Sequence, residues 1–209
     1  MLWLARFSGI LAAIVWVLGT PLVAMAGVIP SDAEYFYIGL VCTLLGLALM
    51  PVITALRYRS SGRFTMAIRL CGLTICLALT ASGALLMLAA AGKLGERAPE
   101  WIPGPSFIAA AVLFIWIGLA SYALRGRSTV ERAIFGLGVL TTASFLLPVA
   151  ASFIVTYVIR GFVYTNATAL PSLLLGILLW LSLPAWLTVI VLRLWPQASA
   201  HRTVTARPS

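Results

Sequence analysis

The side chains that perform most enzyme chemistry are few in this sequence and far apart. The single histidine, His201, lies close to the C-terminus, so we expect no haem or zinc site built from histidines inside a helical bundle. Cys71 and Cys76 are five positions apart, which turns them about 140° from each other on a helix. We therefore expect these two cysteines, and Cys42, to pack as small apolar residues rather than to form a redox pair.

The carboxylates lie outside the long apolar stretches of the chain: Asp32, Glu34, Glu96, Glu100 and Glu131. A proton-coupled pump usually carries an acid or a histidine within a membrane-spanning segment, and an intramembrane aspartyl protease needs two aspartates there. The sequence also lacks a Walker-type phosphate loop and a G-x-S-x-G motif. We expect a protein that is not an enzyme and that binds no cofactor and no metal.

Four other residues are candidates for contacts to a ligand or a lipid. Arg69 lies about one turn inside an apolar stretch, where it either binds an anionic ligand or lipid phosphate, or extends its stem so that its charge reaches the polar boundary. Trp16, Trp116 and Trp180 fall near the middle of their apolar stretches. They either line an apolar binding pocket or pack against neighbouring helices.

Hydropathy identifies the elements that must position these residues. The sequence is 62% hydrophobic and only 9% charged, with a mean hydropathy of +1.09, which leaves too little polar surface for a soluble domain. A run of about 20 apolar residues crosses a bilayer as a helix, and solid runs disfavour the alternating strands of a barrel. The sequence predicts an all-α membrane protein with six transmembrane helices, at residues 4–26, 35–56, 65–91, 106–124, 133–159 and 171–192.

Basic residues mark one side of the predicted membrane domain. They gather at alternate ends of the apolar segments: Arg6, Arg57, Arg59, Arg63, Arg69, Arg125, Arg127, Arg132, Arg193, Arg202 and Arg207. The other side holds only Lys93, Arg97 and Arg160 together with most of the acids. The positive-inside rule then predicts cytoplasmic N- and C-termini. The net charge of +9 therefore indicates topology and attraction to an anionic inner leaflet, not a nucleic-acid partner.

The segments form one predicted domain, residues 1–195, followed by a polar tail, residues 196–209, that we expect to be disordered in the cytoplasm. The arginine-rich, lysine-poor composition is typical of a bacterial protein, so we expect the inner membrane. An A-x-A pattern ending at Ala26 leaves open a cleaved signal peptide, but the long apolar run favours retention of residues 1–26. Cleavage would leave five helices and an external N-terminus.

A basic sequence motif occurs twice, as ALRYRSSGR at residues 55–63 and ALRGRSTVER at residues 123–132. Leu56-Arg57, Leu124-Arg125 and Leu192-Arg193 also recur at equal intervals. We interpret this as three parallel two-helix hairpins. The alternative is that six evenly sized helices with cytoplasmic arginines give the same spacing without duplication.

Ala5, Gly9 and Ala13 form a small-xxx-small ladder on the first segment, which lets another helix approach closely. The ladder serves either internal packing or the docking of a partner membrane subunit. In this ladder, in length and in helix number the chain resembles the six-helix substrate-binding subunits of energy-coupling-factor vitamin transporters. The resemblance is one of form, because the ligand-pocket residues of those subunits do not occur here.

Two function classes follow from these observations. Helices without ionisable groups favour a non-catalytic accessory or assembly subunit of a membrane complex. The alternative is a small transport or ligand-binding membrane protein for a neutral or apolar compound, of the substrate-binding subunit type, with its site between the hairpins near mid-depth.

Overall fold

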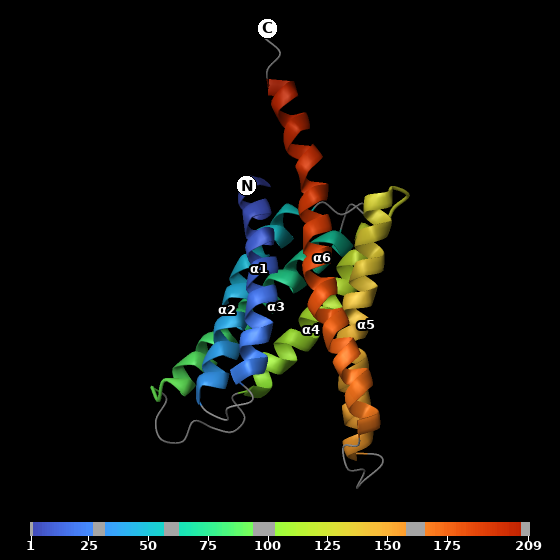
Figure 1. The fold of residues 1–209 in the computed structure, drawn as a ribbon. Helices are drawn as coiled ribbons and strands as arrows, with labels where there is room; N and C mark the ends of the chain where they lie inside the picture. The colour runs from blue at the N-terminus through green and yellow to red at the C-terminus, as the bar shows by residue number, and fades with distance from the viewer. Residues whose placement is uncertain (1, 27–31, 57–62, 94–102, 158–165, 206–209) are drawn as a thin grey trace.

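The computed structural model describes residues 2–26, 32–56, 63–93, 103–157 and 166–205, and within these ranges the chain is helical without strands (Figure 1). The described helices are α1 (Leu2–Ala26), α2 (Asp32–Ala55), α3 (Arg63–Ala90), α4 (Pro103–Leu124), α5 (Thr129–Tyr157) and α6 (Asn166–Thr205). The six predicted segments correspond one to one with these helices. The all-helical fold class is therefore confirmed.

Five of these helices contain a stretch long and apolar enough to cross a membrane: Leu2–Pro21, Tyr35–Ala55, Phe64–Ala90, Thr129–Ala150 and Leu174–Leu194. The corresponding apolar stretch of α4, Ile108–Leu124, is shorter. The chain is thus compatible with a multi-pass membrane protein. The side on which its termini lie and the hairpin repeat stay predictions.

The helices form a closed ring in chain order. Each helix packs against the next one, and α1 packs against α6, as the blue and red ribbons in Figure 1 show. Contacts between α2 and α4 cross the ring. A short connection between consecutive apolar helices favours this antiparallel neighbour packing.

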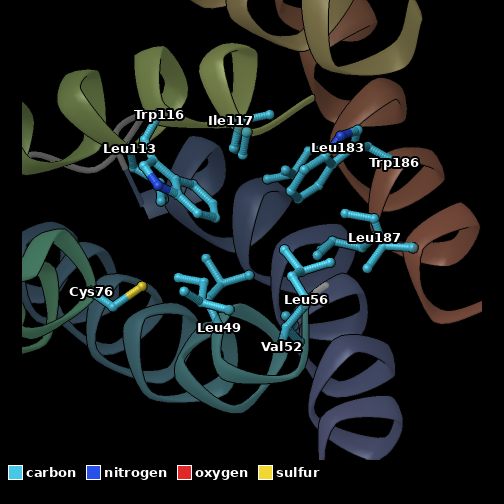
Figure 2. Packing of buried hydrophobic residues seen from close by; sticks show 14 of the residues in the cluster. Leu49, Val52, Leu56, Cys76, Leu113, Trp116, Ile117, Leu183, Trp186 and Leu187 are labelled. Carbon is cyan, nitrogen blue, oxygen red and sulfur yellow. The ribbon is translucent and has the colours of Figure 1, made fainter. Parts of the chain in front are cut away.

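Much of the core of the ring is formed where the C-terminal end of α2 and the middle parts of α4 and α6 meet. Figure 2 shows their side chains turned toward one another: Leu49, Val52, Leu56, Leu113, Trp116, Ile117, Leu183, Trp186 and Leu187. At the other end of the bundle α5 and α6 diverge from the first four helices (Figure 1). There Leu174, Ile177 and Leu178 of α6 are 53%, 44% and 41% exposed. The bundle is therefore packed most fully at the end where α1 begins.

Helices α2 and α3 approach closely because glycine and threonine line their contact. A methyl group placed on Gly83 would lie 2.6 Å from the carbonyl oxygen of Gly39, and one placed on Gly39 would lie 2.5 Å from that of Gly83. The hydroxyl of Thr43 donates to the carbonyl oxygens of Gly39 at 2.8 Å and of Thr80 at 3.4 Å. Small residues and hydroxyls of this kind hold helices together where water is absent.

The second copy of the basic motif, residues 123–132, forms the junction between α4 and α5. Ser128 and Glu131 make a capping box, in which the Glu131 N–H donates to Ser128 Oγ at 3.2 Å and the Ser128 N–H donates to Glu131 Oε2 at 3.3 Å. The other carboxylate oxygen of Glu131 lies 3.5 Å from a guanidinium nitrogen of Arg193 on α6. The guanidinium carbon of Arg125 lies 4.0 Å from the ring centroid of Tyr122. This segment therefore begins α5 and connects it to α6 through the ion pair of Glu131 with Arg193.

Helix α6 continues past the last predicted span, and the disorder of the tail in the cytoplasm stays a prediction. Residues 196–205 continue the helix to Thr205, where the composition predicts a disordered tail, and residues 206–209 lie outside the described ranges. Extending an existing helix avoids the cost of nucleating a new one, so a polar continuation can stay helical.

The third predicted repeat position also differs in its surroundings. Leu56 and Leu124 are 1% and 0% exposed, whereas Leu192 is 56% exposed. The first two copies therefore share a buried leucine at the helix end, and the third does not.

Candidate functional site

Arg69 lies in the N-terminal part of α3 and contacts the end of α2. One guanidinium nitrogen donates to the carbonyl oxygen of Leu56 at 2.6 Å. The last carbonyls of a helix have no partner within the helix, and a positive charge near them is favourable. Arg69 therefore caps α2 and binds it to α3. Its contact with a ligand or a lipid stays a prediction.

Trp116 connects α4 to α3 and is 3% exposed. Its indole nitrogen donates to the carbonyl oxygen of Ile68 at 2.8 Å. A methyl group on Gly72 would lie 2.7 Å from the indole ring, so glycine provides the space that the ring occupies. Because Ile68 precedes Arg69, the fold brings two of the four candidate residues to the same part of α3.

Trp16 and Trp180 lie on α1 and α6, two helices that pack against each other. The indole nitrogen of Trp180 donates to the carbonyl oxygen of Val17 at 3.2 Å. The ring of Trp16 meets Phe114 of α4 edge-on at 5.9 Å between centroids, and Phe114 stacks on Phe145 of α5 at 4.3 Å. These aromatic rings join α1, α4 and α5 across the bundle.

Two buried polar atoms near this cluster have no hydrogen-bond partner in the described structure. They are the indole nitrogen of Trp16 and the hydroxyl oxygen of Ser144, which is 2% exposed and next to Phe145 in the chain. A buried donor left unpaired is unfavourable by about 1–3 kcal/mol.

A buried hydrogen bond between two side chains of the core was not predicted from the sequence. Trp186 of α6 is 1% exposed, and its indole nitrogen donates to the hydroxyl of Ser121 on α4 at 2.7 Å. Gly138 of α5 lies against the Ser121 side chain, so that three helices meet at this point. A tryptophan, a serine and a glycine on separate helices give no spacing signal that would reveal this contact.

The small-residue ladder of α1 packs within the chain at all three of its positions, although Ala13 is only partly buried. Ala5 is 0% exposed, and a methyl group on Gly9 would lie 2.6 Å from the Val191 side chain of α6. Gly9 and Ala13 also line an open apolar groove of about 530 Å³ between α1 and α6. The groove is lined by Gly9, Ile10, Ala13, Ile14, Val17, Leu18, Thr188, Val191 and Leu192.

The cysteines lie in three different environments. Cys76 is buried, Cys42 is partly buried and Cys71 is exposed, and all three are free thiols. Among the described residues no three or more His, Cys, Asp or Glu side chains lie together as a metal site.

Comparison with known proteins adds no assignment to this geometry. The chain matches no family model, no curated protein and no solved structure.

Proposed function

We propose that this chain is a non-catalytic accessory or assembly subunit of a bacterial inner-membrane complex, with six membrane spans and cytoplasmic termini. The observation that supports this most is the use of its polar side chains. Indole, hydroxyl and guanidinium donors on one helix bind carbonyl oxygens on another, as in Trp116, Thr142 and Arg69. Such a bundle is a rigid packing unit that presents apolar outer faces to a partner.

The sixth span in this proposal is α4. The helix has 22 residues and therefore extends about 33 Å, which matches a hydrocarbon core of about 30 Å. Its neighbours α3 and α5 both contain candidate spans, so α4 must return the chain across the membrane if the ring stands upright in the bilayer. The first helix is retained in this proposal because it closes the ring.

Photo-crosslinking from the outer faces of the helices tests the subunit proposal. A photoreactive phenylalanine analogue is placed, one position at a time, at residues that are each more than half exposed: Phe7, Leu70, Leu119 and Leu181. A docked subunit covers one face, so we expect one or two positions to crosslink a single membrane protein while the others label only lipid. The same partner must then co-purify in a fixed ratio with the untreated chain.

The matched control places the analogue at the buried position Phe114, which is 2% exposed and should label only this chain. Labelling of lipid alone from every face contradicts the subunit proposal.

The buried unpaired atoms of Trp16 and Ser144 favour one second candidate, binding of a neutral compound near mid-depth. Under that candidate a small molecule alone raises the thermal stability of the purified chain. The effect disappears in Trp16→Phe and persists in Trp3→Phe, because Trp3 is 73% exposed.

A further inference from the structure

The groove between α1 and α6 ends at a positive charge. Arg6 precedes Gly9 and Ile10 by three and four residues on α1, so its side chain leaves the same face of the helix that lines the groove. Its guanidinium donates to the carbonyl oxygen of Leu194 at 2.9 Å, just beyond the α6 residues of the groove. This bond holds the charge at the mouth of the groove.

The length of the groove matches one leaflet of a bilayer. Its lining on α1 runs from Gly9 to Leu18, a rise of about 14 Å along a helix. Half of a hydrocarbon core of about 30 Å is about 15 Å. A transmembrane helix of about 20 residues is about twice as long as the groove, so the groove matches an acyl chain of one leaflet more closely than a membrane-spanning partner.

The lining is apolar along this whole length. Thr188 contributes the one hydroxyl among the lining residues, and that hydroxyl donates to the carbonyl oxygen of Pro184 at 2.8 Å within α6. The walls therefore offer contact surface without polar groups that a ligand must satisfy.

We propose that this groove binds one phospholipid of the leaflet on the side of the N-terminus. One acyl chain lies along Ile10, Ile14 and Leu18, and the phosphate contacts Arg6. An arginine suits this role because its guanidinium keeps its positive charge while it donates to Leu194, and that charge attracts a phosphate. The inference depends on α1 and α6 spanning the membrane and does not depend on the subunit proposal.

Native mass spectrometry of the delipidated full chain, titrated with dioleoyl phosphatidylglycerol, tests the inference. We expect one lipid to bind more tightly than all later ones. Ala13→Phe fills the groove and should abolish this first binding step. Ile14→Trp covers the groove from its exposed side and should act in the same direction, which keeps the test valid if Ala13→Phe does not fold.

Arg6→Gln should weaken the first step about fivefold, the usual contribution of one basic residue at an anionic lipid surface. Ala67→Phe on the exposed face of α3 and Arg125→Gln at the end of α4 are the matched controls and should leave the step unchanged.

Two further probes separate the acyl chain from the phosphate. Dioleoylglycerol has the chains without the phosphate and should bind about as weakly to the wild type as phosphatidylglycerol binds to Arg6→Gln. Glycerol 3-phosphate has no chains and should not compete. The inference is wrong if glycerol 3-phosphate displaces the lipid, if Arg6→Gln has no effect, or if the groove variants bind as the controls do.

Discussion

Gly83→Leu is expected to destabilise the bundle strongly, because Gly83 lies at the close contact of α2 with α3. The added side chain must enter the space where a Cβ atom would already lie 2.6 Å from the Gly39 carbonyl oxygen and 2.6 Å from the Thr43 hydroxyl. The Gly39 backbone cannot rotate away, so α2 and α3 must separate. Overpacking of this kind is unfavourable by about 3 kcal/mol, which lowers the melting temperature of a chain of this size by about 10 °C.

The measurement is thermal unfolding of the purified chain in detergent, followed by tryptophan fluorescence. Gly176→Leu is the matched control, because a Cβ atom at Gly176 meets nothing within 4 Å. The control should stay within about 0.5 kcal/mol of the wild type. Equal melting temperatures for the two variants would show that α2 and α3 do not meet at their glycines.

Trp186→Ala is expected to cause the second large loss in the free energy of unfolding. The loss comes from packing in the core and not from a clash at the contact of two helices. The indole is 1% exposed, and its removal leaves a cavity between α4, α5 and α6 and an unpaired Ser121 hydroxyl. Loss of a buried tryptophan is unfavourable by about 3–5 kcal/mol. Trp186→Phe keeps most of the packing and should lose about 1 kcal/mol, the usual contribution of a hydrogen bond.

Trp3→Ala is the control for this substitution, because Trp3 is 73% exposed on α1. Unfolding by guanidinium in mild detergent, followed by circular dichroism, compares the three variants. If Trp3→Ala destabilises the chain as much as Trp186→Ala, the core is not where the structure places it.

The helices themselves were predictable because the bilayer imposes their length. A run of about 20 apolar residues has few other uses, so hydropathy alone locates each segment. The arginines in the loops likewise predict the orientation directly, through the positive-inside rule.

The packing faces were not predictable, because both the core and the lipid-facing surface of such a helix are apolar. Leu4 and Ala5 are neighbours of similar polarity, yet Leu4 is 52% exposed and Ala5 is 0% exposed. Trp3, Trp116 and Trp186 likewise differ only in where the helices turn them. Small residues gave the best available signal. The ladder of α1 has intervals of four residues and is visible in the sequence, whereas Gly39, Thr43 and Gly46 on α2 have intervals of four and three and do not fit that pattern.

The candidate site was predictable in part. The sequence singled out Arg69 and three mid-helix tryptophans by depth. In the fold Trp116 donates to Ile68, the residue before Arg69, and Trp180 donates to Val17, the residue after Trp16. The sequence does not reveal that Arg69 donates to Leu56 or that Trp116 donates to Ile68, because both acceptors are backbone carbonyl oxygens. A backbone acceptor leaves no trace in the residue types of a sequence.

Reporter fusions at Lys93 and Gly126 test most directly the central claim that the ring stands in the membrane as six spans. These residues flank α4, the helix with the shortest apolar stretch. The account predicts that alkaline phosphatase is active at Lys93 and inactive at Gly126, and that a cytoplasmic fluorescent reporter gives the reverse. Phosphatase activity at both positions, or at Gly126 alone, would contradict it.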